Sequence, residues 1–246
     1  FDPKEVFSNA LDKVQSLLRP NFLPIISSVV LAKTLLRRST GKVNGFVVEG
    51  HTAGGHNAPP RGKMQLDENG EPIFGEKDTP KLEKIKELGL PFWLAGEYDS
   101  PEKLREAQEA GAEGVQLGTA FAFCDESGMA DNEKRKVIQK VVEESAVVLT
   151  DPRVSPTGYP FKVVQLENTM AVPEVYAARP RLCDLGLLRD AYKREDGSVG
   201  YRCEAKPEDQ YIKKGGKAED LEGRGCLCNN LCASAGYPQH RKNGYV

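Results

Sequence analysis

Blocks of hydrophobic and polar positions alternate along the first 150 residues, and their lengths separate strands from helices. Short apolar runs without alternation are typical of strands that are covered on both faces. Four such runs occupy residues 22–28, 45–49, 91–96 and 114–119. We expect each of them to form a buried strand.

Longer blocks with apolar residues at helical spacing lie beside these runs. Thr79-Pro80 and Ser100-Pro101 each place a hydroxyl side chain before a proline, which is typical of a helix N-cap followed by the first helical position. The spacing predicts helices over 3–18, 29–38, 79–88, 100–111 and 131–149.

Four repeats of strand and helix are the signature of parallel βαβ units. Right-handed crossovers bring the carboxyl ends of parallel strands to one edge, where the sites of barrel and doubly wound folds lie. The loops after the four strands should therefore converge, at 27–28, 50–62, 96–100 and 118–128. Four units cannot close an eight-stranded barrel, so the pattern predicts half of one.

The regular pattern fades after residue 150, which divides a partial barrel at 1–150 from an extension at 151–246. The end of this extension is rich in turn residues and holds five of the six cysteines, so we expect it to be irregular. An earlier polar stretch at 57–78 contains Asn69-Gly70, a strong turn signal that predicts a small hairpin.

Composition and charge exclude several classes of protein. The 246 residues carry a net charge of −2, which gives no electrostatic reason to bind nucleic acid or a membrane surface. No apolar run reaches the roughly 18 residues that span a bilayer, and no signal peptide is visible, so we expect a cytoplasmic protein. The chain opens at Phe1 without Met, and we expect it to begin inside a longer protein.

The loop after the run at 45–49 carries the densest candidate chemistry. Gly54-Gly55 allows positive φ and a close approach of the backbone to a ligand. Two of the three histidines, His51 and His56, lie in this loop. Imidazole titrates near neutral pH, so His56 is either a catalytic base or a residue that hydrogen-bonds to its own loop. The two glycines before it favour the base.

Gly96 and the pair Gly118-Thr119 follow two adjacent expected strands. A Gly-Thr pair at a strand end can offer backbone N–H groups and a hydroxyl to a phosphate. Either glycine alone is an ordinary turn residue. Two adjacent strand ends of this kind are typical of the phosphate site for a barrel-bound flavin or sugar phosphate, so we expect a phosphate-bearing cofactor.

Four cysteines near the C-terminus have the ligand type for zinc or an iron–sulfur cluster. Their spacing matches neither the two-residue knuckle of zinc sites nor the ferredoxin run. Cytosolic cysteines are normally reduced, so we expect buried free thiols and no metal site. The spacing assigns no role to Cys203, Cys226, Cys228 and Cys232.

Two motifs resemble one enzyme family. Ala53-Gly54-Gly55-His56 after an apolar strand, and the run 114–121 (GVQLGTAF) further along, resemble the nitronate monooxygenases, formerly called 2-nitropropane dioxygenases. The same flavin-barrel family includes flavin-dependent enoyl-thioester reductases, and the motifs do not separate its members. The resemblance covers about residues 20–170. It implies an α/β fold, the C-terminal portion of an FMN-binding (β/α)8 TIM barrel. The segment 156–162 (PTGYPFK) resembles the family's loop after the last regular helix, which implies a cofactor-proximal loop at the start of the region 151–246.

The resemblance also implies roles for particular residues. His56 falls on the family's proposed base. One departure is Gly96-Glu97, where the family usually has two glycines, because a carboxylate repels a phosphate unless it points away. The FMN-binding positions fall on Gly54, Gly55, Gly96, Glu97, Gly118 and Thr119.

The activity implied by the resemblance is FMN-dependent oxidation of nitronates or nitroalkanes with O₂ to a carbonyl compound and nitrite. Its partners are a small-molecule substrate and O₂, with no nucleic acid and no membrane, and a homodimer is left open. Two alternatives also stay open: a flavin-dependent enoyl-thioester reductase that uses NAD(P)H, and a non-catalytic or metal-binding module.

Overall fold

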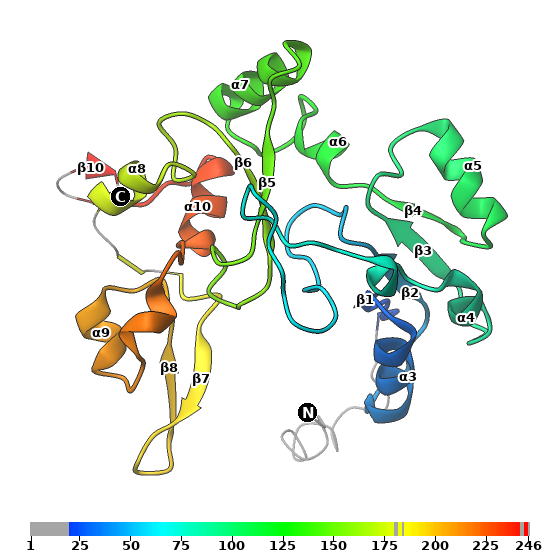
Figure 1. Ribbon diagram of the computed structural model, residues 1–246, viewed down its shortest axis with the longest axis horizontal. Coiled ribbons are helices and arrows are strands. Elements are labelled where there is room, and N and C mark those ends of the chain that lie inside the picture. The colour runs from blue at the N-terminus through cyan, green and yellow to red at the C-terminus, as the bar shows by residue number, and fades with distance from the viewer. Residues whose placement is uncertain (1–19, 180–181, 184, 242–243, 246) are drawn as a thin grey trace, which may run out of the picture. The chain divides into compact units, whose positions relative to one another are not determined.

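A computed structural model describes residues 20–179, 182–183, 185–241 and 244–245 (Figure 1). These residues form two compact units. The first unit takes in the described residues up to Ala53 together with Gly75–Leu117, and the second takes in Gly54–Phe74 together with the described residues from Gly118 onward. The helix expected over 3–18 lies outside the described residues. The expected division at residue 150 stays a prediction.

A four-stranded parallel sheet forms the centre of the first unit. Its strands lie in the order β1 (Ile25–Ile26), β2 (Phe46–Glu49), β3 (Phe92–Ala95) and β4 (Gly114–Gln116). All three neighbouring pairs are parallel, with Phe46 opposite Phe92 in the central pair. The four expected strands are present, but β1 and β4 are shorter than expected, and the expected burial holds for most of β2 and β3 only. Because the pairs are parallel, the carboxyl ends of all four strands reach the same edge of the sheet.

Two of the helices of this unit begin at the serine caps that their sequences provide. The Ser28 hydroxyl accepts the Leu31 N–H at 3.2 Å to start α3 (Val29–Arg38). Likewise, the Ser100 hydroxyl accepts the Lys103 N–H at 3.2 Å to start α5 (Pro101–Glu109). Each bond satisfies one N–H group that has no partner inside its helix. The helices expected at 29–38 and 100–111 are therefore confirmed.

The helix expected to begin at Thr79 starts later and without a side-chain cap. The N-cap of α4 (Leu82–Lys86) is Lys81, whose side chain makes no capping bond. Thr79 instead ends the short 3-10 helix η1 (Glu76–Asp78), where its N–H donates to the Glu76 carbonyl at 3.3 Å. The prediction of Thr79 as a helix N-cap was therefore wrong, because Thr79 is the C-cap residue of η1.

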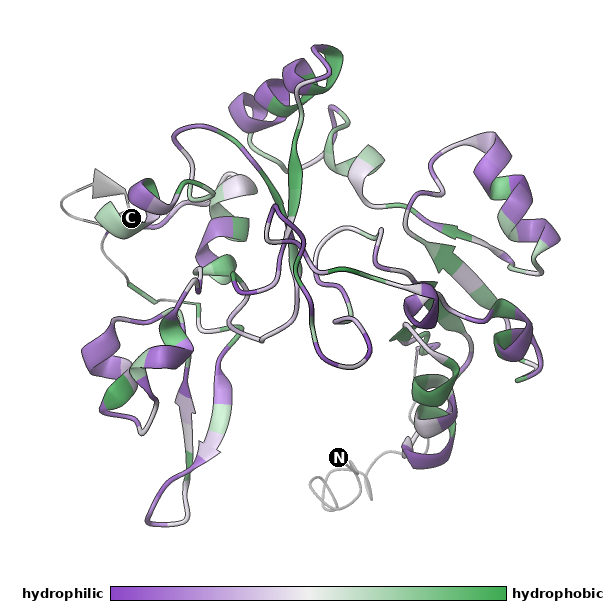
Figure 2. Cartoon of the chain, viewed as in Figure 1, coloured by the Kyte–Doolittle hydropathy of each residue, from purple (hydrophilic) through white to green (hydrophobic). Residues whose placement is uncertain are grey.

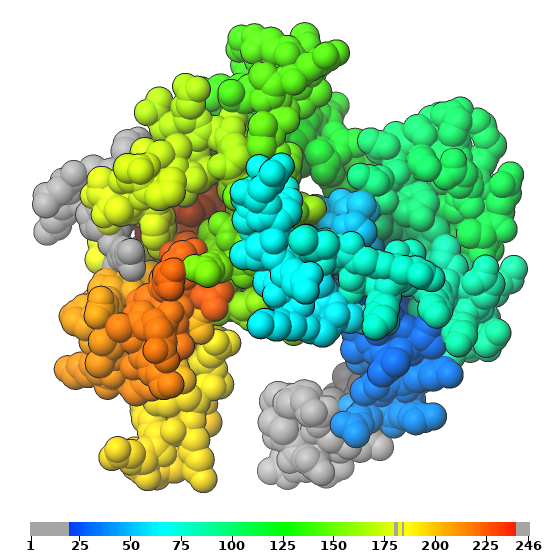
Figure 3. Space-filling model, in the orientation of Figure 1, coloured from blue at the N-terminus to red at the C-terminus, as the bar shows by residue number. Residues whose placement is uncertain are grey.

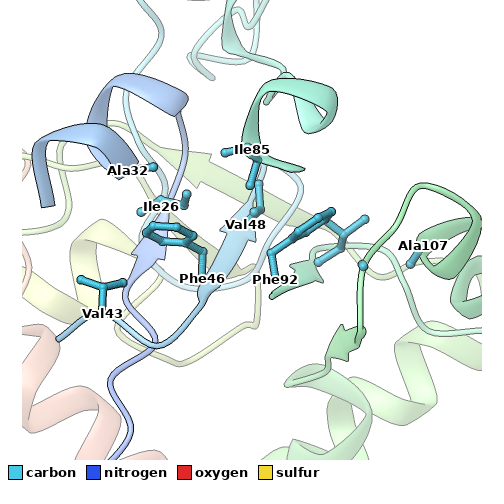
Figure 4. Close-up of a cluster of buried hydrophobic side chains, with 10 residues drawn as sticks. Ile26, Ala32, Val43, Phe46, Val48, Ile85, Phe92 and Ala107 are labelled. Atoms are coloured by element: carbon cyan, nitrogen blue, oxygen red, sulfur yellow. The ribbon is translucent and has the colours of Figure 1, made fainter. Parts of the chain in front are cut away.

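The core of the first unit lies between the sheet and its helices. Ile26, Phe46, Ile85 and Phe92 are each at most 1% exposed and pack into one cluster (Figure 4). Burying side chains of this size is worth roughly 1.5–3 kcal/mol each. Figure 2 shows the matching pattern on the ribbon, with hydrophobic residues along β2 and β3 and mostly hydrophilic residues on α5. The core therefore holds the strand ends in place.

The second unit contains more regular structure than its sequence suggested. The extension expected to be irregular and partly ordered includes a β-hairpin and three short helices. The elements of this unit are α6 (Thr119–Ala122), α7 (Asp131–Val142), β5 (Val148–Asp151), β6 (Phe161–Val164), α8 (Pro173–Ala178), β7 (Asp190–Lys193), β8 (Val199–Arg202), α9 (Glu208–Ile212), η2 (Ala218–Leu221), α10 (Leu227–Ser234), β9 (His240–Arg241) and β10 (Gly244–Tyr245).

Antiparallel pairing organises these elements. β5 pairs with β6, and β7 pairs with β8. Figure 1 and the space-filling view in Figure 3 both place α9 beside the β7–β8 hairpin, where Arg202 Nη1 donates to the Gly215 carbonyl at 2.7 Å. The helix expected over 131–149 ends at Val142, because the chain turns at Glu144 (φ +54°) and continues as β5.

The turn predicted at Asn69-Gly70 is present in the second unit. Gly70 has φ +81°, and the flanking residues Leu66 and Pro72 form one isolated antiparallel bridge. The predicted hairpin therefore forms as a turn with a single bridge. The Glu71 carboxylate accepts the Thr150 N–H at 2.5 Å, which ties this turn to β5.

Strand pairing leaves the parallel sheet open within the described residues, with β1 and β4 at its edges. The half barrel therefore stays a prediction, whereas the parallel α/β arrangement is observed. Among the same residues, no helix combines the length and apolar character that crossing a membrane requires.

Candidate functional site

Residues 55–57 pair with the start of β6 in the second unit. Lys162 N–H donates to the Gly55 carbonyl at 2.9 Å, and Asn57 N–H donates to the Pro160 carbonyl at 2.9 Å. His56 thereby forms an antiparallel bridge with Phe161. Gly55 has φ +77°, a left-handed conformation that glycine adopts without strain. The second glycine of the Gly-Gly pair thus allows the turn that brings His56 to β6.

The His56 imidazole is half-buried and held on two sides. Its Nε2 lies 2.7 Å from Ser155 Oγ. The ring meets Phe161 edge to face, with ring centroids 4.8 Å apart. Burial lowers the pKa of His56, because a charged imidazolium loses hydration there. The neutral imidazole, which can take a proton, is therefore the form favoured at neutral pH.

Ser155 is a site residue that sequence reasoning missed. It is 0% exposed, and its Oγ lies 2.7 Å from Thr157 Oγ1 and accepts the Thr157 N–H at 3.2 Å. In the sequence it opens a turn-rich segment, 155–163, part of which resembles a cofactor-proximal loop of the family, but it is separated from His56 by 99 positions. No local pattern could pair a serine with a histidine over that distance.

The backbone around Ser155 is held by a segment of the C-terminal extension. Arg224 Nη1 donates to the carbonyls of Arg153 at 2.8 Å and Ser155 at 2.7 Å. The Gly225 N–H donates to the Val154 carbonyl between them at 2.7 Å. Three consecutive carbonyls thus have partners from residues 224–225.

Arg224 is itself anchored by an ion pair with Glu204, at 2.5 Å and with both side chains less than 20% exposed. Burial raises the pKa of Glu204, while the nearby Arg224 guanidinium acts in the opposite direction. The ion pair is therefore mostly buried. It connects the chain just after β8, at Glu204, to the loop that contains Ser155.

Gly118 and Thr119 lie in the same unit as His56. Gly118 is the N-cap residue of α6, and its carbonyl accepts the Ala122 N–H at 2.9 Å. A Cβ placed on Gly54 would lie 3.8 Å from Thr119 Oγ1, so the His56 loop and the Gly-Thr pair are neighbours. A Cβ on Gly118 would meet nothing within 4 Å. The structure therefore brings Gly54, Gly55, His56 and Thr119 together.

Gly96 and Glu97 belong to the first unit, where they line a pocket of about 280 Å³ with His51, Thr52 and Lys103. Gly96 has φ +95°, and a Cβ there would lie 2.7 Å from Thr52 Oγ1. Glu97 has φ +58°, which is rare for a residue with a Cβ. The backbone at Glu97 thus adopts a conformation that glycine usually provides.

The charges in this pocket suit an anion poorly. Lys103 Nζ pairs with Glu106 at 2.7 Å, and this partner is the main reason that the pKa of Lys103 is raised. Glu97 adds a second carboxylate to the lining. One ammonium thus faces two carboxylates. His51 lies here, in a different unit from His56, so the two histidines of the loop do not form one cluster within a unit.

The residues of the second unit fit the phosphate of a flavin better. Gly118 leaves open space beside its backbone, and Thr119 adds an exposed hydroxyl. Amide and hydroxyl donors of this kind are suitable partners for phosphate oxygens. Glu97 is the one expected cofactor residue whose side chain does not fit, so only its backbone N–H could serve.

Four cysteines line a separate cavity of about 20 Å³ in the second unit: Cys183, Cys203, Cys226 and Cys228. The six cysteines are free thiols. Burial raises the pKa of Cys203 to about 11 and also raises that of Cys226. Within the described ranges, no group of three or more His, Cys, Asp or Glu side chains is placed to hold a metal ion. The expectation of no metal site stays a prediction.

Comparison with known proteins identifies the family. The family model described as nitronate monooxygenase matches residues 4–166. A probable nitronate monooxygenase of Staphylococcus saprophyticus is 26% identical over 185 residues, which cover 74% of this chain and 49% of the relative. Another from Staphylococcus haemolyticus is 32% identical over 107 residues, covering 43% of this chain and 28% of the relative.

A third relative comes from Mycobacterium tuberculosis and is named (3aS,4S,5R,7aS)-5-hydroxy-7a-methyl-1-oxo-octahydro-1H-indene-4-carboxyl-CoA dehydrogenase. It is 26% identical over 143 residues, which cover 58% of this chain and 36% of the relative. The chain thus spans at most about half the length of these relatives. Because the family model matches well over half of its residues, the chain belongs to the nitronate monooxygenase family.

Proposed function

We propose that this chain provides the base and part of the cofactor site of an FMN-dependent oxidoreductase that oxidises nitronates or nitroalkanes with O₂. The observation that carries the proposal is His56. It occupies the family's Ala-Gly-Gly-His motif, its pKa is lowered by burial, and the loop before it neighbours Thr119. The partners of the reaction are a small-molecule substrate and O₂.

His56 removes the α-proton of a neutral nitroalkane, or orients a nitronate that is already anionic. Gly54, Gly55, Gly118 and Thr119 hold the cofactor in the second unit through backbone N–H groups and one hydroxyl. Gly96 and Glu97, which lie in the first unit, stay expectations from the resemblance to the family. FMN, when bound, supplies the redox chemistry that converts the nitronate and O₂ to a carbonyl compound and nitrite.

The test begins with the visible spectrum of the purified chain after incubation with FMN and gel filtration. We expect a retained flavin band and nitrite release from 2-nitropropane. A colourless chain that FMN does not reconstitute would contradict the proposal.

A His56→Asn variant tests the base. Asparagine keeps a polar side chain of similar size but cannot take a proton at neutral pH. We expect this variant to bind FMN and to lose turnover of neutral nitroalkanes by about 10²-fold or more. Unchanged turnover would remove His56 from its role.

A second candidate function is oxidoreduction of a thioester substrate, as in a flavin-dependent enoyl-thioester reductase that uses NAD(P)H. The name of the Mycobacterium tuberculosis relative, a carboxyl-CoA dehydrogenase, favours this class. Anaerobic mixing of the FMN-loaded chain with NADH or NADPH separates the two candidates. Rapid bleaching of the flavin would favour the thioester enzyme, and a flavin that stays oxidised would favour the nitronate enzyme.

A further inference from the structure

The two ring nitrogens of His56 have different surroundings. Nε2 lies 2.7 Å from the hydroxyl of Ser155, a side chain with no exposed surface. Within the part of the chain that the structure describes, Nδ1 makes no hydrogen bond. A substrate therefore cannot reach Nε2 without displacing a fully buried residue, whereas no hydrogen bond within the described residues occupies Nδ1.

The hydrogen bonds of Ser155 accommodate an arrangement of protons in which His56 Nε2 is the donor. A serine hydroxyl has one donor and two acceptor positions. The Thr157 N–H occupies one acceptor position, at 3.2 Å. If His56 Nε2–H occupies the second, the Ser155 proton points to Thr157 Oγ1, which lies at 2.7 Å. All three bonds are then satisfied at once, and Nδ1 carries the lone pair.

We propose that Ser155 is a positioning residue: it accepts the Nε2–H of His56 and thereby assigns Nδ1 as the atom that takes the α-proton of the substrate. The inference rests on the proposed function, in which His56 is the base. The α-carbon–hydrogen bond breaks, its electron pair stays on the substrate as a nitronate anion, and Nδ1 gains the proton. Ser155 keeps the same acceptor role before and after transfer, so the hydrogen bonds need not rearrange.

The C-terminal extension contributes to this positioning. Arg224 and Gly225 hold the three carbonyls of residues 153–155, and Arg224 is anchored by Glu204. A base must lie within a few tenths of an ångström of its working position to be effective. The extension, which carries no expected site residue, thus supports the base indirectly through the backbone of Ser155.

The first test is ¹⁵N NMR of the imidazoles, which does not depend on activity or on FMN. The chain has three histidines, so comparison with the His56→Asn spectrum assigns His56. In the wild-type chain we expect the neutral ring to be protonated at Nε2. A neutral ring protonated at Nδ1 would overturn the proposal, and this measurement needs no Ser155 variant that folds.

A ¹⁵N NMR titration of the Ser155→Ala variant measures how much the hydrogen bond between Ser155 and His56 contributes to the pKa of His56. Removing the acceptor destabilises the imidazolium, so the pKa of His56 should fall further. The control is Thr169→Val: the Thr169 hydroxyl also accepts an N–H two residues later, from Ala171 at 3.3 Å, but has no link to His56. The control should leave the His56 titration unchanged. A titration that is equally unchanged in Ser155→Ala would contradict the proposal.

Kinetics then separate positioning from general damage. With FMN bound, Ser155→Ala should lower kcat/KM for a neutral nitroalkane by about tenfold or more. With a pre-ionised nitronate, which needs no proton removal, the change should stay within about twofold. An equal loss with both substrates would assign Ser155 a structural role only. If the wild-type chain turns over neither substrate, the proposed function fails while the NMR result still decides the bond.

Discussion

At the scale of single residues, Gly96 is the clearest case of a position fixed by space and backbone together. It follows β3 with φ +95°, and a Cβ would lie 2.7 Å from Thr52 Oγ1 and 2.9 Å from the Ala53 nitrogen. Both the conformation and the contact therefore exclude a side chain. The glycine thus keeps the β3 loop against the start of the His-Gly loop within the first unit.

Gly96→Ala should lower the free energy of unfolding by about 1–3 kcal/mol, because it adds strain at a positive φ and a clash with backbone. Urea denaturation followed by Trp93 fluorescence measures this, since Trp93 lies in β3. Gly75→Ala is the matched control: Gly75 has φ −131° and a Cβ there meets nothing within 4 Å. Equal effects of the two substitutions would contradict the argument.

The proposed role of His56 as the base predicts the pH dependence of the proposed reaction. Burial holds the pKa of His56 below its ordinary value of 6.5. A base works in its neutral form, so activity should be lost only when the pH falls below the lowered pKa. We expect the acid limb of kcat/KM for a neutral nitroalkane to lie below pH 6.5. With a nitronate substrate that limb should weaken or vanish, and a limb above pH 6.5 would assign the titration to another group.

At the scale of elements, the sequence predicted helices and strands correctly where the deciding interactions lie within a few residues of one another. Ser100 caps its helix as predicted, because its hydroxyl reaches an N–H three residues later. Ser28, which was not predicted as a cap, makes the same bond. Thr79 also places a hydroxyl before a proline, yet it is the C-cap residue of the preceding η1 and caps no α-helix. The run 146–149 is apolar and fits a helix or a strand equally. The pairing of Val148 and Leu149 with β6 makes this part of the chain a strand, β5. Such tertiary choices are not encoded in a local pattern.

Paired substitutions test this difference between the two capping sequences. Ser100→Ala removes the bond to the Lys103 N–H at 3.2 Å and should cost about 1 kcal/mol of stability. Thr79→Ala removes an exposed hydroxyl that caps no helix, and should change stability by less than about 0.5 kcal/mol. Thermal or urea unfolding of both variants is sufficient. A larger loss for Thr79→Ala would restore Thr79 as a cap.

The candidate site likewise contains one residue that a local motif predicted and others that only the folded structure places there. His56 was predicted because Gly-Gly-His is a local motif with chemistry of its own. Ser155 and Arg224 were not, because a serine before a proline and an arginine between glycines carry no specific signal. Only folding places the Ser155 hydroxyl at 2.7 Å from His56 Nε2 and the Arg224 guanidinium at 2.7 Å from the Ser155 carbonyl. The hydrogen-bond partners of His56 are thus harder to predict from the sequence than His56 itself as a candidate site residue.

At the scale of the whole molecule, the chain consists of two interleaved compact units. Each carries part of what the sequence assigned to one site: Gly96 and Glu97 in the first, His56, Gly118 and Thr119 in the second. The only tryptophan, Trp93, lies in the first unit, so its fluorescence follows that unit alone. The stability of each unit can therefore be measured separately in the intact chain.

Two arginines of the second unit provide the last prediction. Arg224 pairs with Glu204 at under 20% exposure and holds two carbonyls, whereas Arg153 pairs with Glu222 at 56% and 76% exposure. Arg224→Gln should destabilise β5 and β6 by about 2 kcal/mol, because it leaves a half-buried carboxylate without its cation. Arg153→Gln should cost less than about 0.5 kcal/mol, because exposed pairs are screened.

Hydrogen exchange of peptides covering β5 and β6 measures the second unit, and Trp93 fluorescence in urea measures the first. For Arg224→Gln we expect faster exchange in β5 and β6 and an unchanged Trp93 midpoint, since every contact of Arg224 described above lies in the second unit. If the Trp93 midpoint fell by the same free energy, the chain would unfold as one cooperative body. If Arg153→Gln had the larger effect, burial would not be what makes the Arg224 pair important.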